Sequence, residues 1–145
     1  MRLRTAEQRD APAVADVFLQ AFRSLTFLPI VHGDEETREW VASWLVPETE
    51  LWVAEGDGEI VGFIALTGDV VGWLYVHPKA QRSGIGTRLL DKAKELRSDG
   101  FELWVFQQNV GARGFYERHG LRCVELTDGS TNEERTPDAR YEWRP

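Results

Sequence analysis

The sequence predicts an α+β fold in which helices flank a single mixed, mostly antiparallel sheet. Stretches with a helical period alternate with short apolar stretches, in the order βααβββαβαββ. Two turn sequences, Gly56-Asp57-Gly58 and Gly68-Asp69, join three strands in series, which is typical of an antiparallel meander. A length of 145 residues with no repeat or linker favours one domain, residues 1–145.

The first half of the chain is expected to contain one strand and two helices. Residues 2–5 form the strand, a first helix begins at Pro12, and a second begins near Asp34, which is a good N-cap. Apolar residues at helical spacing define one stripe on each helix, and on the second helix this stripe is expected to be the buried face. The stripes are Val14, Val17, Phe18, Ala21 and Phe22 on the first helix, and Trp40, Val41, Trp44 and Leu45 on the second. The connection 24–33 has neither period but is unusually apolar for a loop.

The second half of the chain is expected to supply the rest of the sheet and two more helices. The predicted strands are 51–55, 59–67, 70–76, 101–106, 121–126 and 140–143, and the predicted helices are 84–97 and 110–119. Gly120 then ends the last helix as its C-cap. A polar excursion, 127–138, joins the last two strands.

Composition and charge exclude several classes of protein. Seventeen basic against twenty-four acidic residues give a net charge of −7, and no basic run favours nucleic-acid binding. The longest apolar stretches, around 60–66, are far shorter than the ~20 residues that span a bilayer, and no signal-peptide pattern follows Met1. A single cysteine, Cys123, allows neither an internal disulfide nor a cysteine-rich zinc site. We therefore expect a cytoplasmic protein without membrane, nucleic-acid or metal partners.

A glycine-bearing loop between a strand and a long helix is the most informative segment. It lies between Leu74 and Leu90, with Gly84 and Gly86 where the helix begins. Free amides at a helix N-terminus attract phosphate, and glycines let a diphosphate approach the backbone. The two glycines could equally serve only tight packing of the helix on the strand. The loop lacks the lysine of a P-loop, and it has Leu89 in place of the third glycine of a dinucleotide-binding fingerprint.

Two motifs in this part of the chain resemble a known family. Gln81-x-x-Gly84-x-Gly86, after a strand and before an amphipathic helix, resembles the acyl-CoA pyrophosphate loop of the GNAT superfamily of N-acetyltransferases. Residues 103–109, followed by 115–121, are similar to the fifth strand and fourth helix of that family. The resemblance extends along essentially the whole chain and implies the GNAT acyl-CoA N-acyltransferase fold. It also implies an N-acetyltransferase that depends on acetyl-CoA.

The resemblance implies roles for individual residues. A strand edge would contact the pantetheine arm, the loop amides would hold the pyrophosphate, and Asn109 would contact pantetheine or cap its helix. The implied acyl-CoA-binding residues are Leu74, Tyr75, Val76, Gln81, Arg82, Ser83, Gly84, Ile85, Gly86, Thr87 and Asn109. Tyr116 matches the tyrosine that protonates the departing CoA thiolate, although a tyrosine here also suits a core aromatic.

N-acetyl transfer requires a neutral amine to attack the thioester carbonyl, with a backbone amide at Val76 stabilising the developing oxyanion. The carboxylates that relatives use as a base have no counterpart here. Trp104 stands at one such position, and Val70 and Val71 stand at the other. The candidates that remain for the base are His32, Glu35, Asp69 and a water chain.

The acceptor is expected to be the primary amine of a small molecule, because the acidic balance of the chain tolerates a cationic amine. Segments 27–32 and 127–138 would shape its site, and Glu133 and Glu134 could hold its charge. The apolar side chains of 27–32 indicate a pocket wall, a lid or a homodimer contact. The alternative functions are a non-catalytic acyl-CoA-binding sensor or interaction domain, and a peptide or protein N-acetyltransferase.

Three further residues are expected to be structural. His77 would be a turn residue before Pro78, and His119 a solvated helix end where a partly charged imidazole suits the negative pole of the helix. Cys123 alternates on a strand and would be a buried apolar group rather than a nucleophile.

Overall fold

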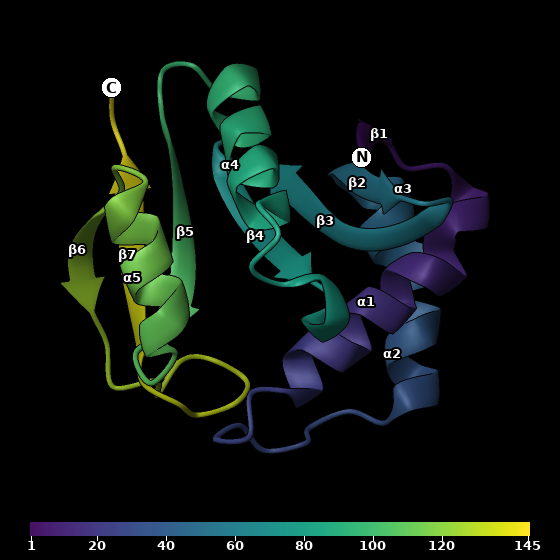
Figure 1. Ribbon diagram of the computed structural model, residues 1–145. Helices are drawn as coiled ribbons and strands as arrows, with labels where there is room; N and C mark the ends of the chain where they lie inside the picture. The colour runs from purple at the N-terminus through teal and green to yellow at the C-terminus, as the bar shows by residue number, and fades with distance from the viewer.

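A seven-stranded mixed sheet forms the centre of the computed structural model, which describes residues 1–145 (Figure 1). The strands are β1 (Arg2–Thr5), β2 (Glu50–Gly56), β3 (Glu59–Thr67), β4 (Val70–Val76), β5 (Phe101–Phe106), β6 (Arg122–Leu126) and β7 (Asp138–Trp143). They lie in the order β1-β2-β3-β4-β5-β7-β6, and every neighbouring pair is antiparallel except β4 and β5. The predicted α+β class and the meander of β2, β3 and β4 are confirmed.

The helices follow the predicted order. They are η1 (Gln8–Asp10), α1 (Ala11–Arg23), α2 (Asp34–Trp40), η2 (Val41–Leu45), α3 (Val46–Glu48), η3 (Pro78–Ala80), α4 (Ile85–Leu96) and α5 (Val110–Arg118). Segments α2, η2 and α3 form one continuous helical stretch, in which η2 is a π turn. The predicted order βααβββαβαββ therefore holds, with this stretch as the second helix.

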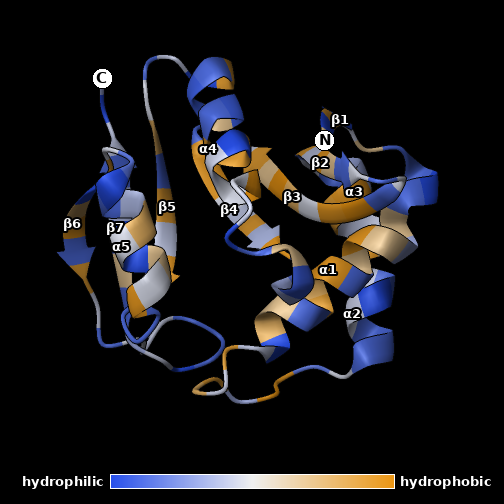
Figure 2. Ribbon diagram, in the orientation of Figure 1, coloured by the Kyte–Doolittle hydropathy of each residue, from blue (hydrophilic) through white to orange (hydrophobic).

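Two hydrophobic cores cover the two faces of the sheet. Strand β3 contributes Ile64 and Leu66 to the core under α4 and α5, and Phe63 and Ala65 to the core under α1 and η2. Because neighbouring residues of a strand point to opposite faces, these assignments place α1 and α4 on opposite sides of the sheet. Figure 2 shows hydrophobic residues along the loop between α1 and α2, beside a mainly hydrophilic α2.

One expectation for the second helix is wrong. Val41 and Leu45 are fully buried as predicted, but Trp44 is 40% exposed and Trp40 is half-buried. In a π turn the hydrogen bonds run from i to i+5, so a stripe drawn at 3.6-residue spacing does not continue through it. Trp44 instead stacks on the Trp40 ring at 5.8 Å between centroids.

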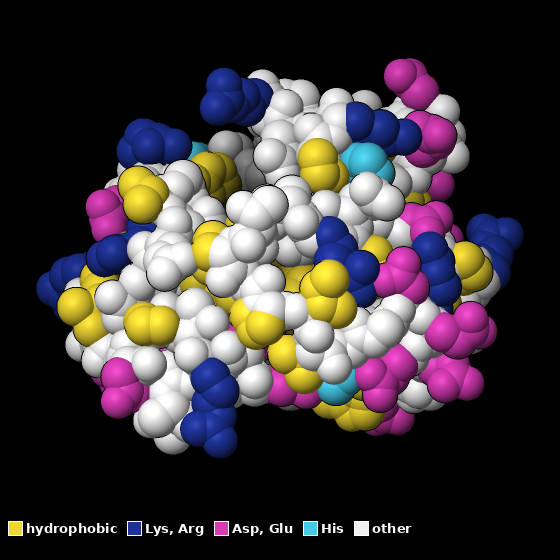
Figure 3. Space-filling model, turned by 90° about the horizontal axis from the view of Figure 1, so that it is seen from below, with side chains coloured by type: hydrophobic (Ala, Val, Ile, Leu, Met, Phe, Trp, Pro, Cys, Tyr) yellow, Lys and Arg dark blue, Asp and Glu magenta, His cyan; other side chains and the backbone are white.

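Strands β4 and β5 separate along their length, and this separation positions the site. They pair only at Val70 with Glu102 and at Val71 with Leu103, and then diverge toward the bottom of Figure 1. A bulge in β4 precedes the divergence, because Gly72 has no partner of its own on β3. Seen from the diverging end, the molecule presents hydrophobic side chains in the middle of its face (Figure 3).

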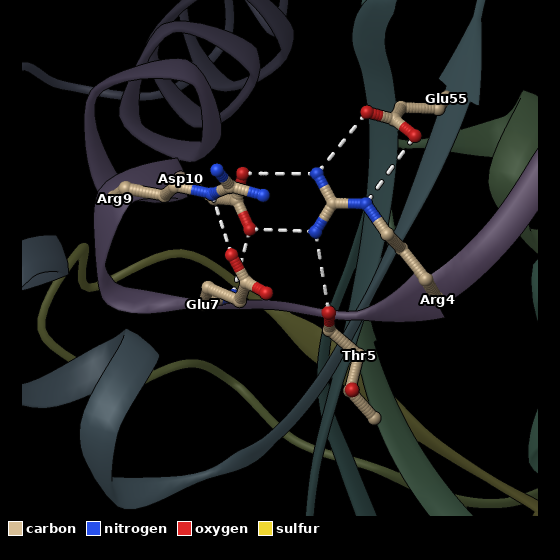
Figure 4. A network of polar contacts seen from close by, with 6 residues as sticks. All are labelled: Arg4, Thr5, Glu7, Arg9, Asp10 and Glu55. Carbon is tan, nitrogen blue, oxygen red and sulfur yellow. Dashed lines mark hydrogen bonds and ion pairs between the residues drawn. The ribbon is translucent and has the colours of Figure 1, made fainter.

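An ion-pair network, which sequence reasoning missed, fixes the beginning of the chain (Figure 4). The Arg4 guanidinium donates to both carboxylate oxygens of Asp10 at 2.8 and 3.0 Å, and to both of Glu55 at 3.1 and 3.3 Å. Asp10 is buried and also accepts from the Glu7 amide at 2.7 Å. The hydrogen bonds from Arg4 lower the pKa of Asp10. Strands β1 and β2 are thereby joined to the start of α1.

None of the helices combines the length and the apolar character needed to cross a membrane.

Candidate functional site

The edge of β4 that faces β5 has backbone amides free of strand pairing. The His77 amide donates to the Val61 carbonyl of β3 at 2.8 Å. Amides alternate in direction along a strand, so the Tyr75 amide also faces β3, while those of Leu74 and Val76 face the opening toward β5. The Val76 carbonyl points the same way and accepts from the Gln81 side chain at 3.1 Å. We call this opening between β4 and β5 the wedge.

The predicted anion-binding loop lies at the start of α4. Gly84 is the N-cap with φ 84°, no side chain caps the helix, and the first helical hydrogen bond runs from the Arg88 amide to the Gly84 carbonyl at 3.1 Å. The amides of Ile85, Gly86 and Thr87 therefore lack helical partners. Arg82 precedes them with φ 65° and forms no ion pair, and the Ser83 hydroxyl is bonded to the Ala80 carbonyl.

The two glycines of this loop serve different needs. A Cβ at Gly84 would meet nothing within 4 Å, so glycine is required there by the left-handed backbone. A Cβ at Gly86 would lie 3.4 Å from the Phe115 ring of α5, which is ordinary van der Waals contact, so only a side chain larger than a methyl group would press on that ring. Conformation thus accounts for Gly84, while at Gly86 the Phe115 ring limits the size of the side chain, and both residues leave the amides open to an anion.

Asn109 is the N-cap of α5. Its side-chain oxygen accepts a hydrogen bond from the Ala112 amide at 3.2 Å, which confirms the capping role. The contact with pantetheine stays a prediction.

Tyr116 lies in α5 and is 7% exposed, with its ring 5.5 Å from Phe115 and 6.1 Å from Tyr141. Its hydroxyl has no partner in the protein, and no fully buried polar side-chain atom lacks one, so the hydroxyl reaches open space. Burial raises the pKa of Tyr116 to about 12. The residue is thus both a core aromatic and a phenol that keeps its proton at neutral pH.

Of the expectations for the two histidines and the cysteine, only that for His77 is fully confirmed. His77 caps the η3 turn by accepting from the Lys79 amide at 3.2 Å, as predicted. The solvated role expected for His119 is wrong, because its ring contacts the Phe115 carbonyl at 2.7 Å and the Thr87 hydroxyl at 3.0 Å. Its imidazole thus ties the end of α5 to the first turn of α4. Cys123 is half-buried rather than buried, although it packs against the core.

A cavity of about 620 Å³ opens on the α1 side of the wedge. Its walls are unusually rich in aromatic rings, namely Phe18, Phe22, Trp40, Trp73, Tyr75, Trp104 and Phe106. The rings pack edge to face, with centroids 5.3 Å apart for Phe18 and Tyr75 and 5.4 Å apart for Trp40 and Trp73. Ile30 and Val31 also line the cavity, so the apolar loop forms a pocket wall.

A histidine held by two carboxylates forms part of the cavity lining. His32 Nδ1 lies 2.5 Å from Glu36 Oε1, and His32 Nε2 contacts the carboxylate of Glu133. These two hydrogen bonds raise the pKa of His32. The contact joins the loop after α1 to the loop between β6 and β7, and Figure 3 shows acidic side chains beside a histidine on this face. We call the three residues the His32 clasp.

None of the three candidate bases is a free proton acceptor inside the cavity. His32 lines the cavity, but both of its nitrogens face carboxylates that favour its protonated form. Glu35 does not line the cavity. Asp69 lies at the opposite end of β4, where its carbonyl accepts from the Glu102 amide at 2.9 Å.

Glu134 is the carboxylate that the search for a base overlooked. It lines the cavity, is half-buried and forms no ion pair and no side-chain hydrogen bond. The pKa of Tyr75 is raised by burial first, and then by the nearby Tyr116 hydroxyl and Glu134 carboxylate. These three side chains therefore share one electrostatic environment. The sequence indicates Glu134 as one acidic residue of the polar excursion 127–138, but it does not show that this side chain points into the cavity.

Comparisons with known proteins agree with one another. The family described as acetyltransferase (GNAT) domain matches residues 47–122, slightly more than half of the chain. A peptidyl-lysine N-acetyltransferase, YjaB of Salmonella typhimurium, is 34% identical over 118 residues, which are 81% of this chain and 72% of that protein.

Solved structures show the same fold. The apo form of YjaB from Escherichia coli superposes with a TM-score of 0.81 at 22% identity, covering 98% of this chain and 96% of that one. The PaiA N-acetyltransferase of Thermoplasma acidophilum, in complex with coenzyme A, gives 0.76 at 18% identity, covering 99% and 98%.

Proposed function

The chain belongs to the GNAT family of N-acetyltransferases, and we propose that it transfers the acetyl group of acetyl-CoA to the primary amine of a small molecule. The observation that supports this most is the position of the wedge. Free backbone amides lie along the β4 edge of the wedge and at the start of α4. A cavity of about 620 Å³ lies on the α1 side of the wedge. A donor and an acceptor bound in these two places would meet beside Val76.

The donor would bind along β4 and at the start of α4. The amides of residues 82–87 would hold the pyrophosphate, because a helix N-terminus carries partial positive charge and open donors. The Arg82 side chain is free to add a positive charge there. The open edge of Leu74, Tyr75 and Val76 would hold the pantetheine arm. Asn109, which follows β5 at the start of α5, would contact that arm from the other side of the wedge. The bound coenzyme A of the PaiA structure supports acyl-CoA as the donor class.

The reaction forms a bond from the amine nitrogen to the carbonyl carbon and breaks the bond from that carbon to sulfur. The Val76 amide, which faces the wedge, donates to the carbonyl oxygen as negative charge develops on it. Tyr116 gives its proton to the leaving sulfur, and the high pKa of about 12 keeps that proton in place until then. The ammonium loses two protons in all, one of which restores Tyr116 and one of which leaves through water in the cavity.

The first experiment is a calorimetric titration with acetyl-CoA, followed by an assay of free CoA release with a panel of amines. Binding in the micromolar range with stoichiometry near one, and CoA release that requires an amine, are the expected results. Absence of acetyl-CoA binding would refute the donor site. CoA release with peptides alone would refute the small-molecule acceptor.

A second candidate acceptor is a lysine side chain in a peptide or protein. The relative named peptidyl-lysine N-acetyltransferase, 34% identical to this chain, favours it. A lysine amine would enter the same cavity at the end of its flexible stem. Short lysine peptides in the amine panel therefore separate the two candidates directly.

A further inference from the structure

We infer that the acceptor is a primary amine carried on a single aromatic body, and that Glu134 holds its ammonium group. This inference rests on the proposed function, because it names the substrate class of the cavity described above. An arylalkylamine, such as phenethylamine, represents the class.

The walls of the cavity match a flat apolar body. Trp40, Trp73 and Trp104 supply indole faces and edges, and the rings of Phe18 and Tyr75 close the floor between them. Such rings bind another ring by stacking and edge contacts, and attract a cation to their faces. Trp104 is 45% exposed although it is a large apolar side chain, which indicates a surface that a ligand would cover. A volume of about 620 Å³ lies within the ordinary range of small-molecule sites.

The charges of the cavity leave one free anion. Besides Tyr75, five titratable residues line it, namely Arg23, His32, Glu36, Glu133 and Glu134. Arg23 forms an ion pair with Asp34 at 2.7 Å, and His32 engages both Glu36 and Glu133. Only Glu134 has no partner. The site therefore offers one free carboxylate to an ammonium group, and its aromatic walls suit an apolar body better than the further cations of a polyamine or an aminoglycoside.

The free carboxylate lies near the chemistry. Glu134 and Tyr75 both line the cavity, and Tyr75 lies in β4 between the two residues with open amides, Leu74 and Val76. After burial, Tyr116 and Glu134 both raise the pKa of Tyr75, which is consistent with their lying near it. An ammonium group held by Glu134 would therefore lie close to the wedge, while the body of the ligand lies against the indole rings.

The acceptor panel tests the substrate class. We expect kcat/KM for phenethylamine to exceed that for spermidine, kanamycin and a short lysine peptide by at least tenfold. Equal or faster turnover of spermidine or kanamycin would overturn the aromatic assignment and leave the small-amine function intact. Turnover of the lysine peptide alone would overturn both, so the two failures are distinguishable.

Binding of phenethylamine, followed by tryptophan fluorescence with CoA present, tests Glu134 without turnover. Hydrogen bonds to a charged group contribute enough that Glu134→Gln should raise the Kd about 10- to 100-fold. Glu39→Gln, an exposed carboxylate of α2 outside the cavity, is the matched control and should change the Kd less than about twofold. Trp104→Ala should raise it about 2- to 10-fold.

The neutral isostere 2-phenylethanol separates charge recognition from a structural effect. Wild-type protein should bind it more weakly than phenethylamine, and Glu134→Gln should leave its Kd unchanged. A Glu134→Gln variant that loses both ligands equally would place Glu134 in the framework of the cavity and overturn its role as the ammonium partner. A variant with wild-type Kd for phenethylamine would overturn that role as well.

Discussion

Strand β4 meets its two neighbours in opposite ways. On one side β3 follows it from Thr67 opposite Val70 to Gly62 opposite Val76, so nearly every backbone group is paired. On the other side β5 follows it for two residues only and then turns away. The paired edge uses backbone groups for stability, and the open edge keeps the same groups available for a ligand.

The difference between the two edges of β4 shows that a binding site can use one edge of a strand while the other edge keeps the sheet stable. The paired edge is continuous with fully buried side chains of both cores, among them Phe63 and Ile64. The open edge is lined by side chains that are only half-buried, such as Leu74 and Tyr75. Changes on the paired side should therefore alter folding, while changes on the open side should alter binding and turnover. Four predictions test this division.

The largest effect is expected at Tyr116, on the open side. Tyr116→Phe keeps the ring and removes the proton donor, so kcat should fall about 10²- to 10⁴-fold. The affinity for CoA should hold, because the hydroxyl is not part of the phosphate site. Steady-state kinetics and calorimetry measure the two quantities. Wild-type turnover at every pH would return Tyr116 to a purely structural role.

A large loss of stability is expected at Phe63, on the paired side. Phe63 is fully buried against α1, and Phe63→Ala should lower the free energy of unfolding by about 3–5 kcal/mol. Trp104→Ala, which truncates an aromatic residue that is 45% exposed at the wedge, should cost less than about 1 kcal/mol. Urea unfolding measures both. Equal losses would contradict the division between the two edges.

A tenfold effect is expected at Gly86, at the top of the wedge. A valine there would press on the Phe115 ring, 3.4 Å from the position of a Cβ, and displace the amides that face the pyrophosphate. The affinity for CoA should fall at least tenfold, or about 1.4 kcal/mol. Gly111→Val, in the first turn of α5 with nothing within 4 Å of its Cβ, is the control. A folded Gly86→Val variant with unchanged affinity would refute the loop as the phosphate site.

The smallest effect concerns pH and the His32 clasp. Its carboxylate partners raise the pKa of His32 above the ordinary value of 6.5, so the clasp is complete below that value. It is lost as the pH rises through the raised pKa in the folded protein. NMR titration of His32 should show the raised pKa, and Glu133→Gln should bring it down. A titration of His32 at its ordinary pKa in the wild-type protein would contradict the clasp.

Local sequence signals predicted the frame of the site well. Strands β3, β4 and β5 have the predicted bounds because glycine turns and a proline punctuate them. The start of α4 and the cap at Asn109 also depend on neighbours in sequence, and both were predicted.

Features that depend on distant residues could not be predicted. Arg4 and Glu55 are 51 positions apart, and nothing local identifies them as partners. The tie between His119 and Thr87 and the clasp between His32 and Glu133 need the folded chain to bring their elements together. Glu133 and Glu134 were both expected to hold the charge of the acceptor, and only the fold distinguishes Glu134, which has no partner in the cavity, from Glu133, which engages His32.

The bulge at Gly72 has a consequence at the level of the gene. Counting by twos from Val71, which lies in the α4 core, would put Trp73 in that core too, yet Trp73 and Tyr75 pack on the opposite side. The single added residue exchanges the two faces for the rest of β4. An in-frame loss of the Gly72 codon would leave Val71 opposite Leu66 and Trp73 opposite Ala65, so both rings would stay at the cavity and only the bend that the bulge introduces before β4 leaves β5 would be lost. Among descendants of this gene, the extra residue at position 72 should therefore be kept for the opening between β4 and β5, and not for the direction of the Trp73 and Tyr75 rings.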